Sequence, residues 1–166
     1  MNVVIDACSI ILLAKSSVLE TLAKWRKIIV TEGVYNEVLE GKNKKFLDAL
    51  LLDRLVGEKK ISIEKKLKKE VVQKLTNDFG LGIGEAESIT LALESNALMI
   101  TDNKQGRKAA KVQGLSLIGS IETVTALYKT KRIDKEKAIN TLKILKRVGW
   151  FQDYLIEEAM GDVQNG

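Results

Sequence analysis

The sequence contains no histidine and no proline, and its 166 residues include one cysteine, Cys8. The lack of histidine removes the commonest general base and the commonest transition-metal ligand. One cysteine excludes an internal disulfide and a cysteine-clustered zinc site. Aromatic residues make up only 5% of the chain, which argues against recognition driven by base stacking. Chemistry in this protein must therefore depend on carboxylates, hydroxyls, lysines and the backbone.

Long apolar runs are also missing. No segment reaches the roughly 20 residues needed to cross a bilayer, and the chain starts with a strand-like run and an acid rather than with a signal sequence. We therefore expect a cytoplasmic protein with no membrane partner. A hydrophobic content of 45% and a charged content of 30% fit a soluble globular protein. We expect one domain over residues 1–166, with a helical C-terminal extension from about residue 134.

Charge is distributed unevenly along the chain. The net charge is +5, and residues 104–147 hold 12 Lys and Arg against three acids, whereas the residues after 147 hold four acids and no base. A basic segment of this strength favours a polyanionic partner such as RNA or DNA. The alternative is a solvated lysine-rich surface of the kind common in heat-adapted proteins. The acidic segment 153–162 either packs as a helix against the basic segment or mediates self-association.

Strand and helix patterns alternate along the sequence. Strands are predicted at 2–5, 27–30, 61–63, 97–100 and 115–119. Helices are predicted at 9–25 with a break near 16–17, and at 32–41, 43–55, 64–80, 84–96, 103–114, 120–129, 134–147 and 150–160. This alternation predicts a mainly parallel sheet with helices on both faces. In such sheets, functional residues gather beyond the carboxyl ends of the strands.

Two acids stand directly after buried strands. Asp6 follows "VVI" and Asp102 follows "LMIT". If the two strands are neighbours, both carboxylates point into one crevice at the edge of the sheet.

Two glutamates can join these acids from helices. At about 100° per residue, Glu37 falls at the edge of the apolar stripe of its helix, and Glu85 lies on the apolar side of its own helix. Glu87 and Glu94 turn away from that apolar side, so we expect both to be surface acids. The sequence thus offers four candidate carboxylates for one pocket.

Four carboxylates in one pocket would repel one another, and some would have to stay protonated. A hard divalent cation removes this problem, and a site with only oxygen ligands suits Mg²⁺ or Mn²⁺. These ions can activate water and stabilise an in-line displacement at phosphorus. Taken singly, each acid has an ordinary explanation as a helix cap, a surface acid or a partner of a helix dipole. Their conjunction indicates a metal site.

Four motifs in order resemble the PIN-domain family, especially its prokaryotic subgroup marked by "DASPLI", "GEAEAI" and "DD…GR…A". The matching segments here are "DACSII" (6–11), "VYNEVLEG" (34–41), "GEAESI" (84–89) and "TDNKQGRKAA" (101–110). The resemblance implies a three-layer α/β/α sandwich and Mg²⁺- or Mn²⁺-dependent cleavage of single-stranded RNA or other single-stranded nucleic acid. It makes the candidate catalytic metal ligands Asp6, Glu37, Glu85 and Asp102. Many relatives are toxins, so an antitoxin partner and a homodimer are also expected.

Two positions depart from the family pattern. Cys8 stands where the family often has Ser, and the neighbouring Ser9 could substitute for it. Asn103 stands where a second acid often follows the residue matched by Asp102, and its amide oxygen could coordinate a metal without charge. These departures support a rival hypothesis, a nucleic-acid-binding protein of the same fold without efficient catalysis. A second rival is a phosphatase or phosphotransferase with Asp6 as its nucleophile.

Other residues could support the site. Thr101 either orients a metal-bound water or merely ends its strand. Arg107 either holds a substrate phosphate or forms a salt bridge to one of the acids. We expect a nucleic-acid-binding face to include Arg107 with Lys104, Lys108 and Lys111. Packing rather than base stacking is expected for Trp25, Trp150, Phe151 and Tyr154.

Overall fold

The computed structural model describes residues 1–41 and 46–166. Its strands are β1 (Asn2–Ile5), β2 (Lys27–Thr31), β3 (Ile61–Glu64), β4 (Leu98–Ile100) and β5 (Leu117–Ile118). Its helices are α1 (Ala7–Lys15), α2 (Leu19–Trp25), α3 (Glu32–Leu39), α4 (Leu47–Gly57), α5 (Lys69–Phe79), α6 (Ile83–Ser95), α7 (Lys104–Val112), α8 (Ser120–Lys129), α9 (Lys135–Val148) and α10 (Asp153–Asn165). Strands and helices therefore alternate along most of the chain, as the sequence predicts.

The five strands form a parallel sheet in the order β3-β2-β1-β4-β5. β1 is central and pairs directly with β4, with Ile5 in register with Ile100. The residues that follow these two strands therefore emerge side by side at the carboxyl edge of the sheet. This pairing confirms that the strands before Asp6 and Asp102 are neighbours.

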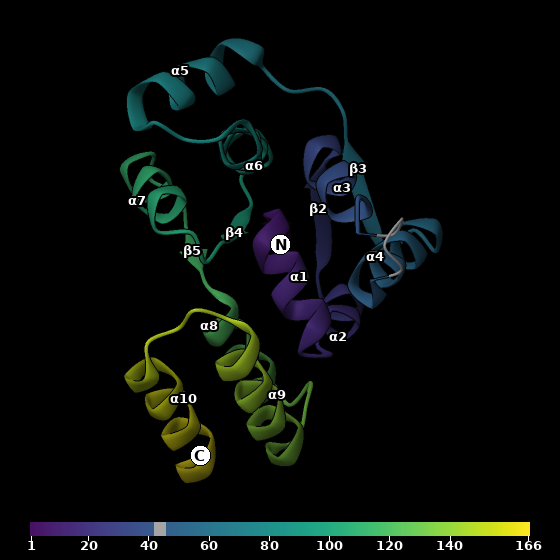
Figure 1. Ribbon diagram of the computed structural model, residues 1–166, viewed down its shortest axis with the longest axis vertical. Coiled ribbons are helices and arrows are strands. Elements are labelled where there is room, and N and C mark those ends of the chain that lie inside the picture. The colour runs from purple at the N-terminus through teal and green to yellow at the C-terminus, as the bar shows by residue number, and fades with distance from the viewer. Residues whose placement is uncertain (42–45) are drawn as a thin grey trace.

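Helices cover both faces of the sheet. Successive residues of a strand point to opposite faces: Val3 and Ile5 join a core with residues of α1–α4 and α8–α10, whereas Val4 and Met99 pack with residues of α5–α7. Full burial of each such aliphatic side chain contributes roughly 1.5–3 kcal/mol. The result is the expected three-layer α/β/α sandwich, with α5 at one end of the molecule and α9 and α10 at the other (Figure 1).

The boundaries of several predicted helices differ from the prediction; α10, for example, covers Asp153–Asn165 instead of 150–160. The sequence predicts a helix over 64–80, but α5 begins at Lys69 because Glu64 still belongs to β3, where it pairs with Thr31. At its other end α5 is closed by Gly80, whose φ of 63° is readily adopted by glycine. The helix predicted over 43–55 is α4, which runs over Leu47–Gly57, and residues 43–45 lie outside the described residues.

The C-terminal helices pack onto the sandwich. α10 contacts both α8 and α9. Lys135 Nζ donates a hydrogen bond to the carbonyl oxygen of Gln164 at 3.1 Å, and Lys146 Nζ lies 4.0 Å from a carboxylate oxygen of Asp153. The acidic helix thus packs against the basic segment, which was one of the two predicted alternatives. Across the two described ranges, no helix has the length and apolar character that a membrane span requires.

Candidate functional site

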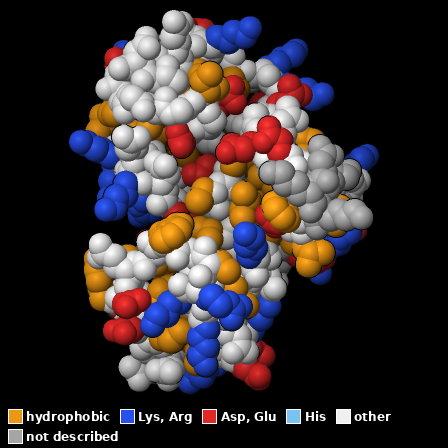
Figure 2. Space-filling view, viewed as in Figure 1, with side chains coloured by type: hydrophobic (Ala, Val, Ile, Leu, Met, Phe, Trp, Pro, Cys, Tyr) orange, Lys and Arg blue, Asp and Glu red, His pale blue; other side chains and the backbone are white. Residues whose placement is uncertain are grey.

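The four acids of the predicted site come from four different elements at the carboxyl edge of the sheet. Asp6 follows β1, Asp102 follows β4, Glu37 belongs to α3 and Glu85 to the first turn of α6. In the space-filling view, several acidic side chains gather in the upper middle of the face, and Lys and Arg lie along its edges and across its lower half (Figure 2). The topology thus brings together segments that are far apart in the sequence.

Asp6 is the N-cap of α1 and is almost completely buried, with 4% of its surface exposed. Its Oδ1 accepts the backbone N–H of Ser9 at 2.9 Å, and its Oδ2 accepts the hydroxyl of Thr101. Burial raises the pKa of Asp6, the hydrogen bonds from Thr101 and Ser9 oppose this rise, and the charge of Asp102 adds to it. Thr101 therefore holds a carboxylate of the site in place, in addition to ending the run of β4.

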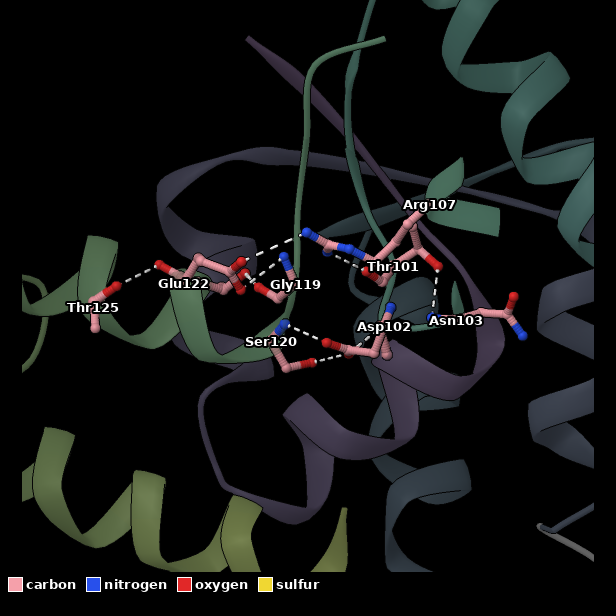
Figure 3. Close-up of polar contacts among 10 residues, drawn as sticks. Thr101, Asp102, Asn103, Arg107, Gly119, Ser120, Glu122 and Thr125 are labelled. Carbon is pink, nitrogen blue, oxygen red and sulfur yellow. Dashed lines mark hydrogen bonds and ion pairs between the residues drawn. The ribbon is translucent and has the colours of Figure 1, made fainter. Parts of the chain in front are cut away.

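Asp102 is held by two serines from different helices, Ser120 of α8 (Figure 3) and Ser9 of α1. Its Oδ1 accepts the backbone N–H of Ser120 at 2.8 Å, and its Oδ2 accepts the Ser120 hydroxyl at 2.5 Å. The hydroxyl of Ser9 donates to the same Oδ2 at 2.8 Å and accepts the backbone N–H of Asp102 at 3.1 Å. Ser9 thus connects the loop after β4 to α1. The sequence analysis missed Ser120, although its place directly after the "LIG" of the last strand is the same signal that marks Asp102.

Glu85 and Asn103 meet between α6 and α7. Glu85 Oε2 accepts the backbone N–H of Gly82 at 2.8 Å, and its Oε1 accepts the side-chain amide of Asn103 at 3.4 Å. The amide oxygen of Asn103 accepts the backbone N–H of Gly106 at 2.8 Å and so caps α7. Asn103 therefore directs its nitrogen toward a site acid and uses its oxygen in a helix cap.

Glu37 reaches the start of α6 from α3. Its Oε2 lies 3.5 Å from the position that a Cβ atom on Gly84 would occupy. Desolvation raises the pKa of Glu37, and the negative charges of Glu85, Glu40 and Asp6 raise it further. Glu37 therefore lies in the same anionic surroundings as the other candidates.

Cys8 lies within the electrostatic influence of all four acids. Burial raises the pKa of its thiol, and the charges of four carboxylates add to this rise, those of Asp6, Asp102, Glu37 and Glu85. The residue that stands at the serine position of the resemblance is therefore in the same negative environment as the candidate acids.

The donor set fits a hard divalent cation in its chemistry, because it consists of carboxylate oxygens and is anionic. In the part of the chain that the structure describes, no ion pair joins a Lys or Arg to any of the four acids. The same residues show no group of three or more acidic or Cys side chains gathered closely enough to hold a metal. Hydroxyl and N–H donors occupy some of the carboxylate lone pairs, but each carboxylate has about four acceptor positions, so room for a cation remains.

Arg107 stabilises the edge of the site without pairing to any of the four acids. Its guanidinium donates to the backbone oxygen of Thr101 at 2.9 Å and lies 3.6 Å from Glu122 Oε1 (Figure 3). Lys104 and Arg107 line a groove of about 640 Å³ between α7, α8 and α10. Lys108 and Lys111 are exposed on α7. Among the described residues, Arg107 does not form the expected salt bridge to one of the four acids, and its ion pair is made to a fifth acid, Glu122.

The predictions made for three residues are wrong. Glu87 is not an ordinary surface acid: its Oε2 lies 2.5 Å from where a Cβ on Gly33 would be, and burial together with Glu32 raises its pKa. The helical wheel of α6 misses this contact because α3 covers that side of the helix. Trp150 and Tyr154 are 103% and 61% exposed instead of packed.

Comparisons with known proteins agree with the fold and the motifs. The family model described as "DUF3368: PIN domain" matches residues 2–164. The chain belongs to the PIN-domain family. Membership supports a nuclease in general, and no curated protein sequence matches the chain.

Two solved structures share the fold of this PIN-domain protein. One is PAE2754 from Pyrobaculum aerophilum, with 16% identity and a TM-score of 0.52 over 75% of this chain and 95% of that one. The other is VapBC2 from Rickettsia felis bound to a DNA fragment from their promoter, with 19% identity and a TM-score of 0.52 over 72% of this chain and 98% of that one. At these identities the similarity extends to the fold alone.

Proposed function

We propose that this PIN-domain protein is a Mg²⁺- or Mn²⁺-dependent endoribonuclease that hydrolyses phosphodiesters of single-stranded RNA. The observation that carries the proposal is the placement of four carboxylates at the carboxyl edge of the sheet, with no Lys or Arg paired to them among the described residues. Such an arrangement is electrostatically costly unless a cation shares the site. RNA is the substrate class that the family resemblance implies.

Asp6, Glu85 and Asp102 would hold the principal ion, with Glu37 as a further ligand or as a base. When bound, the ion supplies positive charge to the acids and to a phosphate, and lowers the pKa of water. The raised pKa of Glu37 makes this carboxylate a better proton acceptor than an ordinary surface glutamate. Lys104 and Arg107 line the same groove as Asp102, and their N–H groups can donate to phosphate oxygens.

Three hydroxyl groups keep the acids oriented. Thr101 donates to Asp6, whereas Ser9 and Ser120 donate to Asp102. Because each donor is fixed in a helix start or strand end, the carboxylates keep their directions without a compensating Lys or Arg. This is the orientation of ligands by outer residues that metal sites commonly need.

A toxin role within a toxin–antitoxin pair is the biological setting that we propose. It is supported by the family resemblance and by the shared fold with VapBC2, which was solved bound to a DNA fragment from the promoter. In this setting the partner would be an antitoxin protein, and the toxin itself could form a homodimer.

A cleavage assay tests the proposed activity. Purified protein is incubated with an unstructured RNA in Mn²⁺, in EDTA, and in EDTA followed by excess Mn²⁺. We expect cleavage in Mn²⁺, its loss in EDTA and its return with excess metal, whereas Asp6→Asn cleaves in none of these conditions. Equal cleavage by Asp6→Asn and wild type would assign the activity to a contaminant and refute the proposal.

One observation favours a second candidate, a nucleic-acid-binding protein of the same fold without catalysis. Asn103 adds no negative charge, and its oxygen already caps α7. RNA binding that weakens with salt but is never followed by cleavage would identify this alternative. A phosphatase with Asp6 as nucleophile is disfavoured, because Asp6 is 4% exposed and both of its oxygens accept hydrogen bonds.

A further inference from the structure

A second groove, of about 290 Å³, lies between α5, α6 and the segment that joins β3 to α5. Its apolar lining is made by Leu67, Val72 and Ile83. Ile83 is 68% exposed, which is unusual for a large aliphatic side chain, and it lies two residues before Glu85. Glu87, which also lines the groove, lies against Gly33 of α3, about one helical turn from Glu37, so the groove opens on the α6 side of the acidic site.

The backbone that carries the lysines of this groove is held in place by hydrogen bonds. In the segment "KKLKK" (65–69), Glu64 accepts the backbone N–H of Lys66 at 2.9 Å, and Glu94 accepts that of Lys68 at 3.1 Å. Leu67 packs inward against the apolar cluster under α5–α7. The lysine side chains are exposed as a consequence of these contacts.

Among the described residues, only one lysine side chain of this segment forms an ion pair. Lys65 pairs with Glu32 at 3.7 Å, but both side chains are exposed, and such pairs are worth about 0–1 kcal/mol. Across residues 1–41 and 46–166, no ion pair is recorded for Lys66, Lys68 or Lys69. The segment is therefore free to attract an anion.

The larger groove beside Asp102 is less suited to a polyanion. It is lined by Lys104 and Arg107 but also by the acids Asp102, Glu122, Glu158 and Asp162. The smaller groove has Lys65 and Lys69 against one acid, Glu87. The balance of charge thus differs in sign between the two grooves, and the smaller one attracts a phosphate backbone.

We propose that the smaller groove binds one nucleotide of a single-stranded RNA, adjacent to the nucleotides at the acidic site. The base would lie on Leu67, Val72 and Ile83, and the backbone phosphate would face Lys65 and Lys69. A volume near 300 Å³ is the lower limit for ligand pockets and suits a single unpaired nucleotide. This inference rests on the proposed function, because it names the path of that substrate.

Fluorescence anisotropy with a 5′-labelled oligouridine tests the groove. Ca²⁺ replaces Mn²⁺ so that the acids are neutralised, and a gel confirms that the strand stays intact. The test variant is Lys65→Ala/Lys69→Ala, and the matched control is Lys129→Ala/Lys143→Ala, which removes the same charge from exposed lysines on α8 and α9. We expect the Kd to rise about fivefold in the test variant and less than about twofold in the control.

Salt dependence separates phosphate contacts from contacts with the base. Each phosphate contact to a single strand contributes about 0.7 to the slope of log Kd against log salt, so the double lysine variant should lose about 1.4 of that slope. Ile83→Ala should weaken binding with the slope unchanged. Equal Kd values for the test and control variants would refute the proposal that the groove binds RNA. Wild-type cleavage in Mn²⁺ would still support the proposed nuclease activity.

Crosslinking provides a second measurement. A strand containing 4-thiouridine should crosslink under ultraviolet light to peptides within residues 65–83. Crosslinks confined to residues 150–162 would place the strand in the larger groove and overturn the proposal. If the wild-type protein neither binds nor cleaves RNA, the proposed function is refuted, and so is the proposal that the groove binds a nucleotide.

Discussion

At the scale of single residues, the acidic site is organised by hydroxyl groups rather than by opposite charges. The family resemblance points to Ser9 as a substitute for the serine that Cys8 replaces, and Thr101 is expected either to orient a metal-bound water or to end its strand. Both residues donate hydrogen bonds to site acids, Ser9 to Asp102 and Thr101 to Asp6. The sequence does not predict Ser120, because its hydrogen bond to Asp102 depends on β5 lying beside β4, and sequence spacing does not reveal that pairing. Local patterns thus identify residues near a strand end, whereas the partner across the sheet follows only from topology.

Removing the Ser120 hydroxyl tests this organisation. Ser120 is completely buried and donates to Asp102 at 2.5 Å, so Ser120→Ala should lower the free energy of unfolding by about 1.5–3 kcal/mol, as expected for a hydrogen bond to a charged group. The matched control is Ser116→Ala at an exposed position, which should change it by less than about 0.5 kcal/mol. Urea denaturation measures both. Equal stability of the two variants would show that the hydroxyl does not stabilise Asp102.

The raised pKa of Asp6 predicts how stability depends on pH in the absence of metal. A carboxyl whose pKa is raised by folding stabilises the protein fully below its unfolded value, 3.8 for Asp6, and this contribution is lost as pH rises through the folded value. In EDTA, Asp6→Asn should therefore become more stable relative to wild type as pH rises above about 4. Thermal melts of both proteins over a pH series measure the difference. A difference that stays constant with pH would contradict the raised pKa.

At the scale of elements, the sequence predicts most helices and strands because each has its own apolar period. The errors occur where a neighbouring element decides the outcome. Residues 65–68 look helical by composition, but the pairing of β3 with β2 and the inward packing of Leu67 delay α5 until Lys69. Glu87 looks exposed on its own helix and is half-buried against α3. Local patterns therefore predict which elements form better than they predict how neighbouring elements bury the side chains.

Gly119, between β5 and α8, is closely surrounded by side chains of the site. A Cβ atom on Gly119 would lie 2.7 Å from Asp102 Oδ1, 2.8 Å from Glu122 Oε2 and 3.2 Å from a guanidinium nitrogen of Arg107. Gly119→Ala should therefore displace Asp102 and cost about 1–3 kcal/mol. Its control is Gly57→Ala at the end of α4, where a Cβ meets nothing within 4 Å, and which should be neutral or slightly stabilising. Calorimetric melting compares them, and an unchanged melting temperature for Gly119→Ala would show that the joint can adjust.

At the scale of the whole molecule, one apolar core joins the sheet to the C-terminal helices. Leu142 and Leu145 of α9 are completely buried in the same cluster as Val3 and Ile5 of β1. Thr141 Oγ1 donates to the backbone oxygen of Ser16 at 3.4 Å, which connects α9 to the end of α1. A core shared in this way favours cooperative unfolding of the sandwich and its helical extension together.

Leu142→Ala tests whether the extension and the sandwich form one unit. The substitution should lower the free energy of unfolding by about 2–5 kcal/mol and shift one common transition, because its cavity opens in the shared core. Far-ultraviolet circular dichroism and tryptophan fluorescence should give coincident urea curves. Two separate transitions, of which only one responds to the substitution, would show that α9 and α10 fold independently of the sheet.

The central claim is that distant segments of this chain converge to bind a hard divalent cation. Titration of Mn²⁺ by isothermal calorimetry tests it most directly, with wild type, Asp6→Asn, Asp102→Asn and the control Glu136→Gln, which removes one charge from an exposed site on α9. The account predicts saturable binding to wild type and Glu136→Gln, and affinities weakened at least about tenfold, or 1.4 kcal/mol, in the two aspartate variants. Wild-type affinity in either aspartate variant would contradict it.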